Sequence, residues 1–566
     1  MIRLFETNKI RPQVILNGIW DFHLENSSIK EKIPVPSCWE MFPNYETYRG
    51  LAFYSKIVNI TKKTNIRLVF KGVSHTARVF WNGEFVKHHY NAYTPFSHII
   101  KDVEPGSYEL KIEVDNSFNE HSALHVPNDY YTYGGITRAV ALEYLNDYFI
   151  ERLEFVSKFI NGKWQATFRA IVKNLTDAEF ASVNINFNIA NQIINGKIIS
   201  RSNDELIFES VHDFDNVLSW CNEAPNLYFL EAQLTQDGVL IDDLIERVGF
   251  REIKVENDKI LLNNKQLFLT GFNRHEDHPL EGCALSFMSM AKDIAILKDL
   301  GSNTVRTSHY PNDELFLDLC DEHGLYVWEE NHARGLSELR MENPNFDKQC
   351  ADCIDEMVKN HFNHPSIIIW AVLNECASNT VYGKNCYANQ INQIKSLDSS
   401  RPVTFATCHQ NDELSLVLAD IISWNLYYGW YESVDTATAF EKLLEFSDKI
   451  GGAGKPFIMS EFGGGAIPGY RDRRRVKWSE EKQVDILTDN LSVYLNHSRI
   501  SGALIWQFCD CLVTEEEWFH ARPRTKNNKG IVDEFRRPKL AYDVVKQMFE
   551  AKIKNDTVSI NEKEDF

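Results

Sequence analysis

Residues 367–375 read IIIWAVLNE, and this stretch decides the fold. The seven consecutive apolar residues from Ile367 to Leu373 predict a strand that is buried on both faces. Such strands occur in parallel sheets whose two faces are both covered by helices. The run ends in the polar pair Asn374 and Glu375, so we expect polar side chains at the carboxyl edge of a parallel sheet.

Strands and helices alternate on either side of this run, from residue 253 to residue 552. One helical pattern ends at Gly301, and another begins at the N-cap residue Asn312 and ends at Gly324. Eight strands over roughly 300 residues is the count of a (β/α)8 TIM barrel, which we therefore predict for residues 253–552. The expected strands are 265–271, 303–308, 325–329, 367–373, 402–406, 421–425, 456–460 and 502–507.

The chain before the barrel has the short alternating patterns of β-sandwiches. In residues 1–145 such runs recur, and Asn82-Gly83 is a strong hairpin signal, so a jelly-roll-like sandwich is expected. Residues 146–252 repeat the pattern over a length that suits an immunoglobulin-like β-sandwich. The polar residues 553–566 are expected to form a frayed tail.

Composition restricts the possible partners and the compartment. The net charge of −20 argues against nucleic acid or an anionic membrane as the main partner. We see no signal peptide and no apolar run long enough to span a membrane, and we expect a cytoplasmic protein. The eleven cysteines are expected to be reduced thiols. Cys350 and Cys353 form a single C-x-x-C pair. A structural zinc ion requires four ligands, so this pair alone does not predict a zinc site.

Two glutamates stand at the carboxyl ends of predicted strands, where TIM-barrel enzymes carry their chemistry. Glu375 follows the fourth strand, and Glu461 follows the run Phe457–Ser460 in the seventh. Glycoside hydrolysis requires two carboxyl groups that face each other. A separation of about 5–5.5 Å between these groups implies retention of configuration. The alternative is that each is a helix-cap neighbour or a loop ion pair. Asn374 is placed to donate a hydrogen bond to a sugar hydroxyl.

Several motifs in order resemble glycoside hydrolase family 2 over almost the whole chain. The segment from Asn363-His364-Pro365 to Asn374-Glu375 is similar to the acid/base segment of that family. Further similar segments are 270–277, 303–311, 460–463, 49–54 and 133–136. The resemblance implies a sugar-binding-like sandwich, an immunoglobulin-like sandwich and a catalytic barrel. It also implies that Glu375 is the acid/base and Glu461 the nucleophile.

Residues 527–530, Asn-Asn-Lys-Gly, resemble the Asn-x-Lys signature of the β-glucuronidases in this family. There the asparagine and lysine, here Asn527 and Lys529, hold the C6 carboxylate of a uronic acid. An ammonium in a partly dry pocket pairs well with a carboxylate. The alternative is a plain turn, since asparagine and glycine are turn formers. The resemblance further implies that Tyr427 lies near the nucleophile and that Asp129 reaches the substrate from the first sandwich.

Two segments depart from the best-known β-glucuronidases. The stretch between Asp510 and Asn527 is longer, so the arginine that assists the carboxylate there has two candidates, Arg522 and Arg524. The segment 331–347 is shorter than in relatives that carry a long loop over the active site. This short segment suggests an open entrance to the active site.

Other polar residues stand at predicted strand ends. His275 and Glu276 are candidates either for a sugar-hydroxyl cradle or for support of the catalytic pair, and His309 for direct contact with the ligand. Trp506 is expected to be a platform under the sugar ring, although a core position is the alternative. His275, Glu276 and His309 can be imagined as a metal site, but we predict no metal and no cofactor.

The expected function is a retaining exo-glycosidase that removes terminal β-D-glucuronic acid by double displacement. In this mechanism the pKa of the Glu375 carboxyl group is raised, whereas the Glu461 carboxyl group stays ionised. One alternative is the same mechanism on another sugar: a β-galacturonide, a β-galactoside, or an arabinoside or galactofuranoside. Another is a non-catalytic carbohydrate-binding protein. A homo-oligomer, dimer or tetramer, is expected because relatives often form one.

Overall fold

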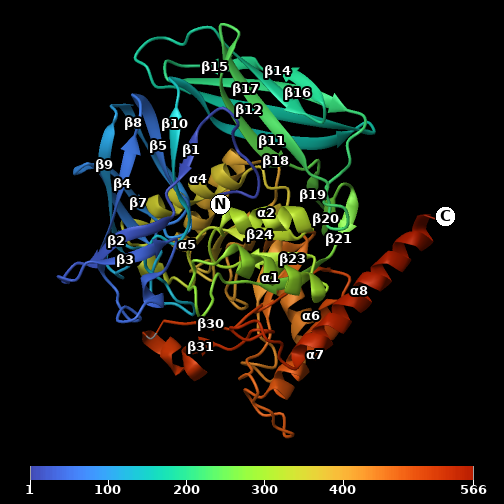
Figure 1. Cartoon of the computed structure of the whole chain (residues 1–566). Helices are drawn as coiled ribbons and strands as arrows, with labels where there is room; N and C mark the ends of the chain where they lie inside the picture. The colour runs from blue at the N-terminus through green and yellow to red at the C-terminus, as the bar shows by residue number, and fades with distance from the viewer. Residues whose placement is uncertain (1, 515, 565–566) are drawn as a thin grey trace.

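The computed structural model describes residues 2–514 and 516–564 and divides them into two β-sandwiches and a barrel (Figure 1). The N-terminal sandwich, blue in the figure, lies beside the barrel, and the middle sandwich lies across the top of both. Each unit has a hydrophobic core of its own. The fold class predicted from the sequence is therefore confirmed.

The N-terminal sandwich is built from a four-stranded sheet, in the order β1-β10-β5-β8, and a six-stranded sheet, β3-β2-β4-β9-β6-β7. Alternating side chains of both sheets form its core, including the fully buried Leu68 and Ile112. Asn82 and Gly83, both at positive φ, make the turn between β6 and β7 as expected. The strands are β1 Gln13–Ile15, β2 Gly18–Leu24, β3 Glu31–Val35, β4 Leu51–Ile60, β5 Thr64–Phe70, β6 Thr76–Trp81, β7 Glu84–Tyr90, β8 Phe96–Val103, β9 Gly106–Asp115 and β10 Val140–Leu145.

The middle sandwich pairs two four-stranded antiparallel sheets, β11-β12-β16-β15 and β14-β13-β17-β18. A three-stranded sheet, β19-β20-β21, then leads into the barrel. The strands are β11 Tyr148–Ile160, β12 Lys163–Asn174, β13 Val183–Ile189, β14 Gln192–Asn195, β15 Lys197–Arg201, β16 Glu205–Phe214, β17 Tyr228–Gln236, β18 Val239–Val248, β19 Ile253–Glu256, β20 Lys259–Leu262 and β21 Lys265–Leu267.

The barrel consists of eight parallel strands in the order β26-β25-β24-β23-β22-β29-β28-β27. The junction between β26 and β27 is looser than the others: a single bridge joins Thr407 to Trp424, and the Thr404 hydroxyl donates to the Ile421 carbonyl at 2.7 Å. The strands are β22 Leu269–Asn273, β23 Thr304–Thr307, β24 Tyr326–Glu330, β25 Ile367–Asn374, β26 Val403–Ala406, β27 Ile422–Asn425, β28 Phe457–Phe462 and β29 Ile500–Ile505.

The strand predicted at 265–271 is wrong in its first half. Residues 265–267 form β21, which pairs with β20, and the barrel strand β22 begins only at Leu269. The sequence shows no break here, because the consecutive apolar residues Leu267, Phe268 and Leu269 run from one strand into the other. The helix expected to start at Asn312 is capped one residue later, by the carboxylate of Asp313, and it ends at Gly324 in the left-handed conformation, as predicted.

Helices cover the outside of the barrel, and the last one, α8, projects from it in red (Figure 1). The segment 553–566, expected to be a frayed tail, continues α8 as far as Glu564, and residues 565–566 lie outside the described residues. None of the described helices is both long and apolar enough to cross a bilayer. The helices are α1 Phe287–Asp299, α2 Glu314–His323, α3 Glu338–Met341, α4 Phe346–His361, α5 Val381–Leu397, α6 Thr436–Ser447, α7 Glu480–Tyr494 and α8 Ala541–Glu564.

The N-terminal segment ties the two sandwiches together through Arg11. Its guanidinium donates to both carboxylate oxygens of Asp242 in β18, at 3.1 and 2.7 Å, and to the carbonyl of Ile150 at 2.7 Å. It also lies 3.3 Å from Glu143 in β10. Arg11 and Asp242 are both buried, so each charge depends on the other for compensation.

Arg11→Ala is expected to destabilise the protein by about 3–5 kcal/mol, because it leaves the Asp242 carboxylate buried without its partner. The measurement is the midpoint of urea unfolding. Lys32→Ala is the matched control in the same sandwich, since Lys32 and Asp21 form an exposed pair at 2.8 Å that is worth at most about 1 kcal/mol. Equal effects of the two substitutions would contradict this interpretation of Arg11.

Candidate active site

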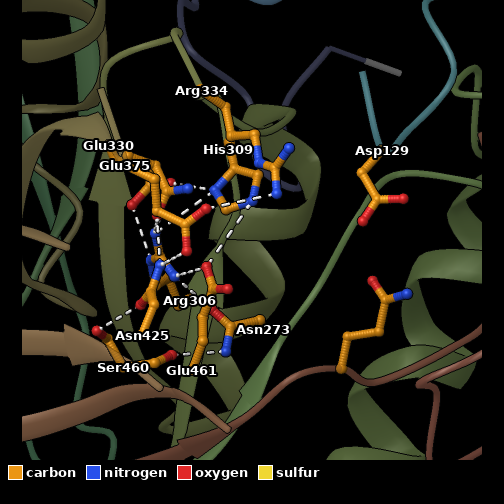
Figure 2. A network of polar contacts seen from close by, with 12 residues as sticks. Asp129, Asn273, Arg306, His309, Glu330, Arg334, Glu375, Asn425, Ser460 and Glu461 are labelled. Atoms are coloured by element: carbon orange, nitrogen blue, oxygen red, sulfur yellow. Dashed lines mark hydrogen bonds and ion pairs between the residues drawn. The ribbon is translucent and has the colours of Figure 1, made fainter. Parts of the chain in front are cut away.

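The two candidate carboxylates stand at the carboxyl edge of the barrel, on strands separated by β26 and β27. Glu375 follows β25 directly, with a positive φ of 49°, and its N–H donates to the Ala406 carbonyl at 2.9 Å. Glu461 lies within β28 and is 3% exposed. Their side chains share one network of polar contacts (Figure 2), and the proximity of Glu375 contributes to raising the pKa of Glu461.

Arg306 of β23 is the centre of this network (Figure 2). Its guanidinium is fully buried and donates to Glu461 Oε1 at 2.7 Å and to both oxygens of Glu330, at 2.8 and 3.0 Å. It also donates to Asn273 Oδ1 at 2.8 Å. A single side chain of β23 therefore links β22, β24 and β28.

Glu461 receives a second hydrogen bond, from the Tyr427 hydroxyl to Oε2 at 2.6 Å. Burial raises the pKa of Glu461 to about 7, against the opposing effects of Arg306 and Tyr427. This shift differs from the ionised Glu461 expected from the sequence, because the sequence does not show that the carboxyl group is buried.

Asn374 presents an unpartnered amide donor. Its Oδ1 accepts from Arg306 at 2.8 Å and from Asn425 Nδ2 at 2.9 Å. Because Arg306 can only donate, the orientation of the Asn374 amide is fixed. Its Nδ2 is buried and has no partner in the described part of the chain, which leaves one donor for a ligand hydroxyl.

Glu375 is held by two donors. Asn425 Nδ2 contacts Oε1 at 3.0 Å, and the Arg334 guanidinium contacts Oε2 at 3.4 Å. Arg334 also donates to Asn128 Oδ1 of the first sandwich, at 3.2 Å. The sequence analysis missed Arg334 because it lies in the irregular segment between β24 and α3, where no periodicity marks which way a side chain points.

The first sandwich reaches the barrel mouth through Asp129. The Arg522 guanidinium makes two short hydrogen bonds to the Asp129 carboxylate, and Asn527 Nδ2 donates to it at 3.0 Å. The structure thus brings the predicted residue Asp129 together with two predicted residues, Arg522 and Asn527, that lie almost 400 positions later in the sequence. Arg524, the other candidate arginine, pairs with Glu534 and does not line the cavity described below.

Lys529 is a buried cation beside this group. Its side chain is 2% exposed, and its Nζ donates to the Tyr431 hydroxyl at 3.0 Å. It lies over the rings of Tyr427 and Tyr431, 4.8 and 5.1 Å from their centroids. Burial lowers the pKa of Lys529, and the nearby Arg522 lowers it further. Among the described residues no carboxylate forms a salt bridge with this ammonium group.

A cavity of about 420 Å³ joins these features. It contains both the lysine and one of the two candidate carboxylates, and it is partly walled by aromatic rings, as sugar sites commonly are. The lining residues are Asp129, Arg334, Glu375, Cys408, Gln410, Asn425, Leu426, Tyr427, Tyr428, Tyr431, Glu432, Trp506, Trp518, Arg522 and Lys529.

Trp506 lines the cavity, and the ring of His309 stacks on it at 4.9 Å. His309 Nδ1 lies 2.8 Å from Glu330, and Nε2 lies 3.9 Å from Glu461. His309 thus lies behind Trp506 and beside Glu461.

His275 and Glu276 lie outside the cavity lining. His275 Nδ1 contacts the Tyr310 hydroxyl at 3.1 Å. Glu276 forms a buried salt bridge at 2.8 Å with Arg138 of the first sandwich. The geometry therefore favours support of the site over contact with sugar for both residues.

One group of potential metal ligands is found in the described residues, Asp318, Asp321 and His364, and it lies away from this cavity. Arg3 already occupies it, with hydrogen bonds to both oxygens of Asp318 at 3.0 and 2.8 Å. This group of potential ligands does not include His275 or His309. It also does not include Cys350 and Cys353, the two buried cysteines of α4.

Sequence reasoning also missed Arg306, Asn425, Tyr431 and Trp518 as site residues. For Arg306 a signal was present, because a charged residue inside a strand of a fully covered barrel must face polar partners. Trp518 is 55% exposed, and nothing in its surroundings in the sequence indicates the cavity.

Comparisons with known proteins agree with this architecture. The chain is 27% identical to a β-glucuronidase of Streptococcus agalactiae, over 94% of this chain and 95% of that one. Its structure is similar to a β-galacturonidase of Eisenbergiella tayi bound to galacturonate, with 47% identity, a TM-score of 0.94 and coverage of 97% and 99%. A β-D-glucuronidase of Dictyoglomus thermophilum gives 25% identity, a TM-score of 0.85 and coverage of 97% and 98%.

Three family descriptions together match almost all of the chain between residues 12 and 555. Residues 12–145 match the sugar binding domain of glycosyl hydrolases family 2, residues 148–251 match a second description of the same family, and residues 253–555 match its TIM barrel domain. With three consecutive matches on the three structural units, the chain belongs to glycoside hydrolase family 2.

Proposed function

We propose that this glycoside hydrolase is a retaining exo-β-hexuronidase, which releases a terminal uronic acid from a glycan or an aglycone. The observation that carries the substrate class is Lys529, a buried ammonium whose partner is a hydroxyl and which forms no salt bridge with a carboxylate in the described part of the chain. A buried charge without a counter-charge is costly, and the C6 carboxylate of a uronic acid supplies that counter-charge. The neutral hydroxymethyl group of a hexose does not.

In the proposed mechanism Glu461 is the nucleophile and Glu375 the acid/base. Arg306 and Tyr427 both donate to the Glu461 carboxylate and so favour its ionised form. Glu461 attacks the anomeric carbon while Glu375 gives its proton to the leaving oxygen. Glu375 then takes a proton from a water molecule while that water attacks the anomeric carbon, which breaks the bond to Glu461 and releases the sugar.

The amide of Asn374 completes the reacting centre. Its free Nδ2 donor is assigned to a hydroxyl next to the anomeric carbon, where a hydrogen bond gains strength as charge develops in the transition state. Trp506 offers a platform for the sugar ring, and the group formed by Asp129, Arg522 and Asn527 binds the end of the sugar near its carboxylate.

We infer that the sugar is β-D-galacturonate, with β-D-glucuronate as the second candidate. The galacturonate-bound relative is 47% identical, whereas the β-glucuronidases named above are 25–27% identical. The two sugars differ only at C4. Matched nitrophenyl β-galacturonide and β-glucuronide distinguish them: a higher kcat/KM for galacturonide is expected, and the reverse order would establish the second candidate.

Lys529→Met is expected to lower kcat/KM for nitrophenyl β-galacturonide by about 100-fold, because a charge-assisted hydrogen bond is lost. The matched β-galactoside, which lacks the carboxylate, should lose little or gain. Lys526→Met is the control: it removes the same charge three residues away, where the ammonium lies 3.5 Å from Glu534. An equal loss on both sugars would exclude the carboxylate-binding role of Lys529.

The absence of turnover by the wild type on every aryl glycoside would instead favour a non-catalytic carbohydrate-binding protein.

The dependence of kcat/KM on pH reports the ionisation of Glu461. With its pKa raised to about 7, activity should fall as pH decreases through that value, because the protonated nucleophile cannot attack. Tyr427→Phe removes a hydrogen bond that favours the ionised form, so this acidic limb should move to higher pH by on the order of one unit. Tyr494→Phe, whose buried hydroxyl has no partner among the described residues, should leave the limb in place. A profile unchanged by Tyr427→Phe would contradict the assignment of Glu461.

A further inference from the structure

Two cysteine sulfur atoms from different domains are in contact. Cys38 Sγ of the N-terminal sandwich lies 3.6 Å from Cys283 Sγ of the barrel. Cys38 is fully buried, whereas Cys283 is half-buried. Cys283 belongs to the segment that follows strand β22 and leads into helix α1.

The backbone on both sides holds these two thiols in place. On the sandwich side, the N–H groups of Ser37 and Trp39 donate to the carbonyls of Ile136 and Gly134, at 2.9 and 3.1 Å. On the barrel side, His278 and Gly282 exchange two backbone hydrogen bonds, at 3.0 and 2.8 Å. The contact is close: a Cβ atom added at Gly282 would lie 2.8 Å from Cys38 Sγ. The sulfur atoms therefore meet because two braced loops are docked together.

We propose that Cys38 and Cys283 form an oxidisable thiol pair, which closes to a disulfide between the sandwich and the barrel. A disulfide needs the sulfur atoms about 2.05 Å apart. The two sulfur atoms are now 3.6 Å apart, so they must approach by about 1.5 Å for the bond to form. The proposal does not depend on the identity of the sugar or on the catalytic roles assigned above.

The reaction with a small-molecule disulfide is balanced in two exchange steps. Cys283, the more accessible thiol, loses its proton and attacks one sulfur of the small disulfide, releasing one small thiolate. The Cys38 sulfur then attacks Cys283 Sγ, which forms the new S–S bond and releases the second small thiolate. The small disulfide is reduced to two thiols, and the cysteine pair is oxidised. Burial raises the pKa of the Cys38 thiol, so the second step is expected to be the slower one.

The disulfide would reinforce a junction that already supports the site. Close by, the Tyr133 hydroxyl of the sandwich donates to Asp277 Oδ2 of the barrel at 3.0 Å. The N–H of Leu512 in β30 (Cys511–Leu512) also points to Asp277 Oδ2, at 3.3 Å. That strand pairs with β31 (Lys526–Asn527), which carries Asn527. The cross-link would span 245 positions of sequence, and a long closed loop restricts the unfolded chain most.

The test uses the full chain, incubated while folded with oxidised glutathione, quenched by alkylation, and mapped by mass spectrometry without reduction. We expect the peptide containing Cys38 to be joined to the peptide containing Cys283. The oxidised protein should unfold at a midpoint about 5 °C above that of the reduced protein. Adding dithiothreitol should reverse both changes.

Cys283→Ser is the control variant, since this half-buried side chain tolerates a hydroxyl. Its unfolding midpoint should be unaffected by oxidised glutathione, even if the exposed Cys408 reacts. Two results would overturn the proposal in the wild type. In one, Cys283 carries glutathione while Cys38 stays free, and in the other both thiols are recovered alkylated.

Discussion

The site depends on one buried cation, Arg306. A guanidinium with no exposure in the barrel interior requires ionised or strongly polar acceptors around it. It finds Asn273 of β22, Glu330 of β24 and Glu461 of β28, and it holds Asn374 of β25 in its orientation. These contacts fix the positions of both the proposed nucleophile and the amide beside the proposed acid/base. Arg306 also offsets part of the cost of burying Glu461, whose pKa is nevertheless raised.

The mouth of the barrel is completed by the first sandwich, which explains why the site needs more than the barrel domain. Asn128 holds Arg334 beside Glu375, and Asp129 receives Arg522 and Asn527. The contacts of Asp129 join chain segments almost 400 positions apart. Lys529 lies next to these residues. Its ammonium group forms no salt bridge with a carboxylate among the residues described. In this arrangement, side chains proposed to bind the sugar also dock the first sandwich onto the barrel.

Much of this could be predicted from the sequence, because it is encoded locally. The apolar run 367–373 and its polar end placed Glu375, and the similar run before Glu461 placed the second carboxylate. The break between β21 and β22 was missed because an apolar pattern does not show which sheet a residue joins. Arg334, in an irregular segment, could not be predicted because its role is defined by Asn128, a partner from another domain. The choice of Arg522 over Arg524 likewise depends on Asp129, and the raised pKa of Glu461 depends on burial, which only the assembled barrel determines.

The proposed double displacement requires Glu461 to form a covalent bond with the sugar. The most direct measurement is trapping with a 2-deoxy-2-fluoro β-galacturonosyl fluoride, followed by peptide mapping of the labelled protein. A slow second step should allow the glycosyl-enzyme to accumulate. One fluorosugar is expected on the peptide containing Glu461, together with a loss of activity that parallels labelling. A label on Glu375, or turnover with inversion and no labelled peptide, would contradict the role of Glu461 as nucleophile.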